Sequence, residues 1–294
     1  MNHIEVIQAG LLTTMQDGGR PGLAFFAIPA SGPLDRVAAQ TANVLVGNAP
    51  TATLLECNFT PPRLRFDHEA TLCLTGADMR WQIDHSPAGR YRTLTISAGS
   101  VLSGQPAEQG SRSYIAVAGD MITTRSFGST ACYALGELGG NAGRPLRAGD
   151  LIVTNPAPVT CRIELSLPAV PSPPIVVDMR CGPEYESLLP ESQKLLEASC
   201  FRIAPDSNRM GARIHGPQLV ARQGLLDSLP VLPGMVQLLP SGSCIVVLQD
   251  GQTTGGYPRI GYLPSLSLDR FNQLRFNQPF SFSCHTQWVE GRAS

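Results

Sequence analysis

A glycine-rich loop with many polar side chains lies near the C-terminal end of the chain. It follows the apolar run 244–248, which is typical of a buried strand. Its glycines and proline favour a tight turn in which some residues adopt positive φ. A loop that only turns needs few polar groups, so the extra donors and acceptors predict a ligand-binding loop. An ordinary turn whose side chains bind their own backbone is the alternative. The polar residues of the loop are Asp250, Gln252, Thr253, Thr254, Tyr257 and Arg259.

Two guanidinium groups occupy a second polar loop, residues 206–213. Arg209 and Arg213 suit bidentate capture of a carboxylate or a phosphate, and Asn208 precedes the first of them. We therefore predict that Asn208 and Arg209 contribute to the binding of an anionic group. A solvated turn in which an arginine pairs with Asp206 explains the same residues equally well.

Two further glycine-rich turns each carry an arginine. Residues 17–22 hold Asp17 and Arg20, and residues 135–144 end at Arg144. The second turn lacks the strand-then-helix context of a phosphate cradle, so a structural turn is the better interpretation. Arg20 and Arg144 are secondary candidates for binding.

The composition is that of a folded protein with one large or two medium domains. The chain has 294 residues, of which 43% are hydrophobic and 15% charged, and its net charge is −1. This balance gives no electrostatic argument for nucleic acid or for an anionic membrane. No apolar run is long enough to span a bilayer, and the first residues lack the features of a signal peptide. A cytoplasmic location is therefore expected.

Cysteine, histidine and lysine exclude several kinds of site. The eight cysteines and five histidines show no metal-ligand spacing, so no tightly bound metal is predicted. Lys194 is the only lysine, so the chain has no P-loop and no lysine in a loop suited to carrying biotin or a Schiff base. Several cysteines lie in apolar runs, which is typical of buried thiols.

Short strands must position these loops. Between residues 51 and 150 they recur at a spacing typical of a sandwich or a barrel. Residues 155–174 contain six prolines and are predicted to be an extended connection. The connection would separate an N-terminal lobe, residues 1–165, from a C-terminal lobe, residues 175–294.

Two helices stand out from the β pattern. Apolar residues at helical spacing predict a helix over residues 34–46, with Ser31 or Gly32 as its N-cap. A second helix is expected over residues 191–199, with Pro190 in its first turn.

With these motifs in order, the chain resembles the family of the 5-oxoprolinase C subunit, also called the KipA, allophanate-hydrolase-subunit-2-like or biotin-dependent carboxyltransferase family. The most specific matches are Ser207-Asn208-Arg209-Met210-Gly211 and Gln252-Thr253-Thr254-Gly255-Gly256-Tyr257-Pro258. Asp120 departs from the family pattern, which usually has glycine there, and Gly251 stands where alanine is common. Weaker matches run along nearly the whole chain: residues 13–20, 31–35, 42–48, 113–119, 138–144 and 181–185.

The resemblance implies a mainly β fold of two cyclophilin-like β-barrel lobes with a few short helices. It also implies a role in the ATP-dependent conversion of 5-oxoproline to glutamate. In that role the chain acts with two partners, a KipI-like protein and a LamB/YcsF-like protein, and is inactive alone. One alternative is a carboxyltransferase-like component of a biotin-dependent urea carboxylase or amidolyase system. Another is a regulatory protein that antagonises a KipI-like kinase inhibitor.

The implied chemistry assigns roles to the polar loops. A lactam is a poor electrophile, and phosphorylation of its carbonyl oxygen by ATP supplies a leaving group for water to displace. Such a site needs arginines and neutral donors around the developing negative charge. General-base candidates are Asp17, Asp35 and Asp250, and the sequence does not rank them or show which member of the complex binds ATP. The residues predicted to bind a small carboxylate or lactam substrate are Asn208, Arg209, Gln252, Thr253, Thr254, Tyr257 and Arg259.

Overall fold

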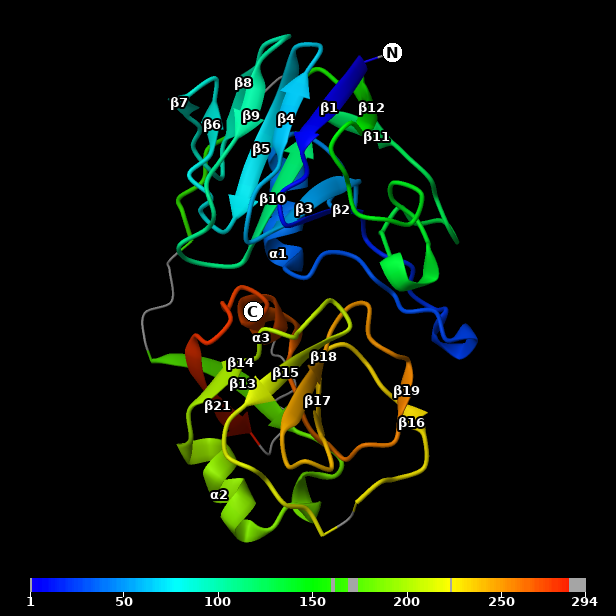
Figure 1. Cartoon of the computed structure of the whole chain (residues 1–294), viewed down its shortest axis with the longest axis vertical. Helices are drawn as coiled ribbons and strands as arrows, with labels where there is room; N and C mark the ends of the chain where they lie inside the picture. The colour runs from blue at the N-terminus through cyan, green and yellow to red at the C-terminus, as the bar shows by residue number, and fades with distance from the viewer. Residues whose placement is uncertain (1, 160–161, 169–173, 223, 286–294) are drawn as a thin grey trace, which may run out of the picture. The chain divides into compact units, whose positions relative to one another are not determined.

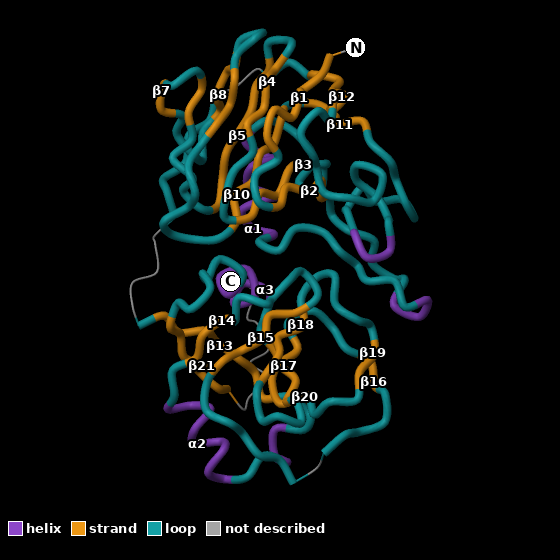
Figure 2. Tube along the Cα trace, viewed as in Figure 1, coloured by secondary structure: helices purple, strands orange, loops and turns teal. Residues whose placement is uncertain are grey.

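The structure is a computed structural model that describes residues 2–159, 162–168, 174–222 and 224–285. These residues are mainly β, as expected, and the chain divides into two compact units (Figures 1 and 2). The first unit comprises Met1–Gly22 and Ala30–Ala169, and the second comprises Leu23–Pro29 and Val170–Ser294. The division falls within the proline-rich segment 155–174, part of which lies outside the described residues.

Two antiparallel sheets build the first unit around one core. One sheet has the order β11-β12-β1-β4-β9-β6-β7 and the other β2-β3-β10-β5-β8. Period-two alternation places Leu55, Cys57, Ile115 and Val117 in the core between the sheets. The strands are β1 (Asn2–Gln8), β2 (Leu12–Gln16), β3 (Leu54–Asn58), β4 (Arg63–Phe66), β5 (Ala70–Gly76), β6 (Gln82–Ile83), β7 (Ser86–Pro87), β8 (Thr93–Ile96), β9 (Val101–Ser103), β10 (Arg112–Val117), β11 (Gly119–Ile122) and β12 (Leu151–Pro156).

Helix α1 (Arg36–Leu45) covers the outer face of the five-stranded sheet. Its small residues Ala38, Ala39 and Ala42 pack with Tyr114 and with neighbouring residues of β5 and β10 in a second apolar cluster. The predicted helix is confirmed, but its predicted N-cap is wrong. Asp35 caps the helix instead, because its extended backbone lets Oδ1 accept a hydrogen bond from the Ala38 amide at 3.0 Å.

The second unit is a closed barrel in the order β13-β20-β17-β18-β15-β14-β21 (Figure 1). One pair within it, β13 with β21, is parallel, and a small two-stranded sheet, β16 with β19, lies outside the barrel ladder. The strands are β13 (Ile175–Cys181), β14 (Phe201–Ile203), β15 (Gly211–His215), β16 (Leu229–Pro230), β17 (Met235–Leu238), β18 (Cys244–Val247), β19 (Thr254–Gly255), β20 (Arg259–Tyr262) and β21 (Pro279–His285).

Aromatic side chains form much of the core of the second unit. The rings of Phe201 and Phe282 lie 5.2 Å apart, and Phe280 packs edge-on against both Phe271 and Phe282. The short helix α3 (Ser265–Phe271) supplies Phe271 and was not predicted, because seven residues are too few to show a helical period.

Helix α2 (Pro190–Ala198) begins at Pro190, as predicted, because a first-turn residue needs no amide hydrogen. Single 3₁₀ turns occur at η1 (Ala24–Phe26), η2 (Ala134–Gly136) and η3 (Tyr185–Ser187). Among the described residues, the helices are all too short or too polar to cross a bilayer.

Candidate functional site

Backbone hydrogen bonds hold the polar loop between β18 and β20 against the segment 226–231. Within this loop β19 pairs with β16, so that Gly255 lies opposite Leu229. The Val231 amide donates to the Thr253 carbonyl at 2.9 Å, and the Leu226 amide donates to the Gly256 carbonyl at 2.8 Å. The loop therefore presents its side chains from a fixed backbone, as a binding loop must.

The glycines of this loop allow close packing rather than an unusual turn. The expectation of positive φ is wrong here, since Gly251, Gly255 and Gly256 do not adopt positive φ. A β-carbon on Gly251 would lie 2.4 Å from Val247 Cγ1, and one on Gly256 would lie 2.6 Å from the Leu226 carbonyl oxygen. Only glycine lets the chain run this close to its neighbours.

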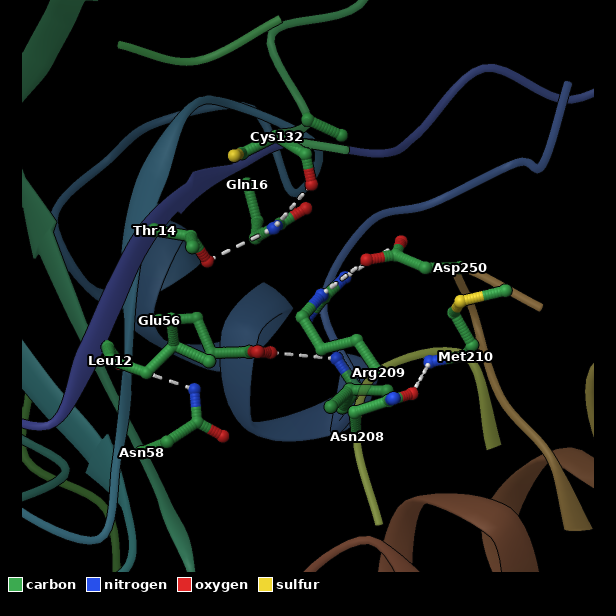
Figure 3. Close-up of polar contacts among 12 residues, drawn as sticks. Leu12, Thr14, Gln16, Glu56, Asn58, Cys132, Asn208, Arg209, Met210 and Asp250 are labelled. Carbon is green, nitrogen blue, oxygen red and sulfur yellow. Dashed lines mark hydrogen bonds and ion pairs between the residues drawn. The ribbon is translucent and has the colours of Figure 1, made fainter. Parts of the chain in front are cut away.

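Arg209 and Asp250 form a buried ion pair that joins the first specific motif to the residues just before the second one (Figure 3). Arg209 Nε donates to Asp250 Oδ2 at 2.7 Å, and the side chains are 10% and 6% exposed. The Asp250 amide donates to the Arg209 carbonyl at 3.0 Å. Asn208 Oδ1 accepts from the Met210 amide at 2.8 Å, so this amide oxygen shapes its own turn. Asp250 is thus part of a charge pair that orders the loop.

Arg259 makes a second ion pair, with Glu184. Its Nη2 lies 2.7 Å from Glu184 Oε1, while its Nε and its backbone amide both donate to Oε2 at 2.9 Å. The hydrogen bonds from Arg259 lower the pKa of Glu184 and raise the pKa of the guanidinium. Glu184 belongs to the Cys181–Tyr185 motif and was not predicted as a site residue. Its carboxylate lies within a segment that matches the family, and this position could have marked it as a candidate.

The remaining predicted residues of the second unit differ in exposure. Gln252 and Thr254 are exposed, and Thr253 and Tyr257 are half-buried. Tyr257 and Pro258 line a largely apolar cavity of about 350 Å³ together with residues 218–221 and 238–242. Asn208 and Arg209 do not line this cavity, so the two motifs do not share its rim. Arg209 pairs instead with Asp250, two residues before the second motif.

Asp17 and Arg20 organise one loop system of the first unit. Asp17 accepts hydrogen bonds from the Gly19 amide at 2.8 Å, from the Ser129 hydroxyl at 2.5 Å and from the Thr130 amide at 2.7 Å. Arg20 is buried, and its guanidinium donates to the carbonyls of Ser126 and Ala131. Asp17 and Arg20 therefore hold the loop 17–22 against the segment 126–131.

Arg144 and Asp35 also have structural partners within the first unit. Arg144 binds both carboxylate oxygens of Asp150 at 2.8 Å, and these bonds lower the pKa of Asp150. Asp35 caps α1. All three candidate bases therefore already have local structural contacts, and two of them belong to the first unit whereas Asp250 belongs to the second.

A buried polar face on β2 and β3 was missed by the sequence reasoning. Glu56 is fully buried and accepts hydrogen bonds from the Tyr114 hydroxyl at 2.9 Å and from the Leu34 amide at 2.7 Å. Burial raises the pKa of Tyr114. On the neighbouring strand, Gln16 Nε2 donates to the Thr14 hydroxyl at 3.0 Å and to the Cys132 carbonyl (Figure 3). The available signal was the recurrence of polar residues at every second position of these strands.

Several of the described cysteines are buried thiols. Burial raises the pKa of Cys73 and of Cys244 to about 12, which keeps both groups protonated near neutral pH. Burial also raises the pKa of Cys57.

Comparison with known proteins places this geometry among carboxyltransferase-like domains. A family model described as carboxyltransferase domain, subdomain A and B, matches residues 26–284. The C subunit of 5-oxoprolinase from Escherichia coli (strain K12) is 33% identical over 285 residues, which cover 95% of this chain and 90% of that protein. The C subunit of 5-oxoprolinase from Haemophilus influenzae is 30% identical over 280 residues, with the same coverage of both chains.

Longer proteins share the same region. The urea amidolyase of Lachancea kluyveri is 25% identical over 95% of this chain, which spans 17% of that protein. The crystal structure of TTHA0988 superimposes with a TM-score of 0.86 at 28% identity, covering 96% of this chain and 55% of that one. The urea amidolyase structure from K. lactis gives a TM-score of 0.89 at 23% identity over 95% of this chain and 18% of that one, which shows a shared fold.

Proposed function

Because this chain belongs to the family described as carboxyltransferase domain, subdomain A and B, we propose that it acts as the C subunit of an ATP-dependent 5-oxoprolinase complex. The observation that carries the proposal is the nearly end-to-end similarity to two proteins of that name, each matched over 90% of its length. In the proposed reaction, 5-oxoproline, ATP and water yield glutamate, ADP and phosphate.

The donor set of the second unit supports a role in holding the lactam. Gln252, Thr253 and Thr254 supply neutral donors from a fixed loop, and Tyr257 presents a flat ring beside it. Neutral donors aimed at a carbonyl oxygen stabilise the negative charge that develops there when the ring opens. This chain would therefore bind and orient 5-oxoproline.

The same unit is poorly suited to a triphosphate. Arg209 and Arg259 bind Asp250 and Glu184 at 2.7 Å, so these two guanidinium charges are already neutralised. A polyphosphate beside them would meet carboxylates as well as cations. We therefore assign ATP binding to another member of the complex. Arg209 and Arg259 do not contact the triphosphate in this proposal.

The proposed complex includes two partners in the cytoplasm, a KipI-like protein and a LamB/YcsF-like protein. On this proposal the isolated chain has no activity, because it supplies donors for the substrate while the ATP site and the catalytic base come from its partners. The existence of partners is inferred from the names of the relatives, which are subunits of a larger enzyme.

An assay of the reconstituted complex tests this proposal. Glutamate and phosphate should form from 5-oxoproline and ATP in a one-to-one ratio when this chain and both partners are present, and neither should form when this chain is omitted. Full conversion by the isolated chain would contradict the division of labour. A complete mixture that forms no glutamate would refute the proposed activity.

A second function is favoured by the family description and by the urea amidolyase relatives. The chain would then transfer the carboxyl group of carboxybiotin, borne by another protein, to a urea nitrogen, which gives allophanate and free biotin. Replacement of 5-oxoproline by urea and a biotinylated carrier, which a separate biotin carboxylase carboxylates with ATP and bicarbonate, distinguishes this function. An assembly that is inactive in both reactions would favour a regulatory protein that antagonises a KipI-like inhibitor.

A further inference from the structure

Gln237 carries a buried carboxamide in the wall of the second unit's barrel. It lies on β17 opposite Arg259 of β20, and the residue is 1% exposed. Within the described chain, no group accepts a hydrogen bond from its Nε2. A buried donor without an acceptor destabilises the folded protein, so its retention at this place requires a reason.

The carboxamide of Gln252 lies close to that of Gln237, beside Gly255. From the position that a β-carbon would take on Gly255, Nε2 of Gln252 is 2.9 Å away and Nε2 of Gln237 is 3.0 Å away. The two nitrogens are therefore less than about 6 Å apart. One acceptor oxygen can bridge such a pair with two hydrogen bonds of ordinary length, about 2.9 Å each.

The surroundings favour a neutral acceptor over an anion. Arg259, next to Gln237 across the ladder, binds Glu184 at 2.7 Å and also reaches the Pro230 carbonyl of β16. The charge beside the amides is thus balanced. Val231 Cγ2, 3.3 Å from the same point on Gly255, adds an apolar wall. Neutral donors beside a balanced ion pair suit the carbonyl oxygen of an amide, which carries no net charge.

We propose that Gln237 and Gln252 form a carboxamide pair over Gly255 that binds the carbonyl oxygen of a small amide substrate, either a lactam or a urea. The inference rests on the proposed function for the identity of that substrate. Gln252 is exposed and gives the pair access to solvent, whereas Gln237 is held by the barrel wall. The bare face of Gly255 keeps the space between the two amides free of a side chain.

Calorimetric titration of the full chain, alone and assembled with its KipI-like and LamB/YcsF-like partners, tests the pair. The probes are 5-oxoproline, 2-pyrrolidinone, urea and proline, the last of which lacks the amide carbonyl. Both lactams should bind and proline should not. Gln237→Met removes the donor at similar volume and should weaken lactam binding about tenfold.

The Tm of each variant shows whether a loss of affinity comes from a lost ligand contact or from a destabilised fold. Gln237→Met should keep or raise Tm, because it removes a buried donor without an acceptor. Gln193→Met is the matched control, since it makes the same change on α2, where Gln193 Nε2 donates to the Tyr185 carbonyl. The control should leave the affinity for the lactams unchanged.

The possible outcomes test the carboxamide pair and the proposed oxoprolinase function separately. Gln237-dependent binding of 5-oxoproline supports both the pair and the proposed function. Gln237-dependent binding of urea without lactam binding supports the pair but rejects the oxoprolinase function. The pair is rejected if Gln237→Met retains full affinity, if proline binds as well as 5-oxoproline, or if neither lactam nor urea binds to the chain or its assembly.

Discussion

The two units use glycine-rich, arginine-bearing loops for different purposes. In the first unit Gly139, Gly140 and Gly143 all have positive φ, and Arg144 beyond them closes the turn on Asp150. In the second unit Gly255 and Gly256 have ordinary backbone angles, so only their close neighbours restrict a side chain there. A glycine with positive φ marks a turn, whereas a glycine with ordinary angles and crowded surroundings marks a place where groups converge. The second kind is the better guide to a site.

The largest expected effect is on the buried ion pair of the second unit. Arg209→Ala leaves Asp250 charged and nearly fully buried, which should lower the free energy of unfolding by about 3–5 kcal/mol. The sequence predicted only a binding role for Arg209, because Asp250 lies 41 residues away along the chain. Chemical denaturation measures the loss directly.

Arg213→Ala is the matched control for that change. Arg213 pairs with Asp206, and both side chains are more than half exposed. The loss should be less than about 1 kcal/mol because solvent screens an exposed pair. Equal losses for the two variants would show that burial of the Arg209 pair does not matter.

The turn glycines of the first unit should tolerate alanine poorly. Gly143 has φ of +71°, and a β-carbon there would lie 2.1 Å from the Glu137 carbonyl carbon. We expect Gly143→Ala to destabilise the protein by about 3 kcal/mol, from backbone strain and overlap together. Thermal unfolding checks this, and a Tm equal to that of the wild type would contradict the steric argument.

The ion pair between Glu184 and Arg259 predicts a pH dependence. The folded-state pKa of Glu184 lies below its ordinary value of 4.5, so its contribution is fully present above about pH 4.5 and is lost as the pH falls through the folded pKa. Glu184→Gln should cost about 2 kcal/mol at neutral pH and make the acid loss of stability shallower.

Asp150 provides the comparison in the first unit, because Arg144 lowers its pKa in the same direction. Denaturation curves collected between about pH 3 and pH 7 should show a shallower acid slope for Asp150→Asn as well. Parallel slopes for wild type and both variants would mean that these carboxylates do not contribute to acid unfolding.

The smallest effect on stability is expected at Gly255. Its backbone angles suit any residue, and the nearest atoms to a new methyl group are the ends of the Gln252 and Gln237 side chains, which can move. Gly255→Ala should cost less than about 1 kcal/mol yet displace both amides and weaken lactam binding. A large loss of stability would place Gly255 among the turn glycines instead.

Local pattern determined the class of fold and several elements. Period-two alternation with glycine and proline punctuation indicated a mainly β chain, and Pro190 marked the start of α2. The two polar loops were also visible, because side chains that exceed what a turn needs are a local feature. The closed barrel came from the family resemblance, since strand pattern alone fits a sandwich equally well.

Tertiary structure decided the partners of the charged and buried groups. Glu184 lies 75 residues before Arg259 in the sequence, and Asp250 lies 41 residues after Arg209, so no local spacing joins either pair. Gln237 is an unremarkable polar residue in sequence; the barrel wall and Gly255 make it a buried donor. Ion pairing and burial depend on strand register across the barrel, and register is set only when the core packs.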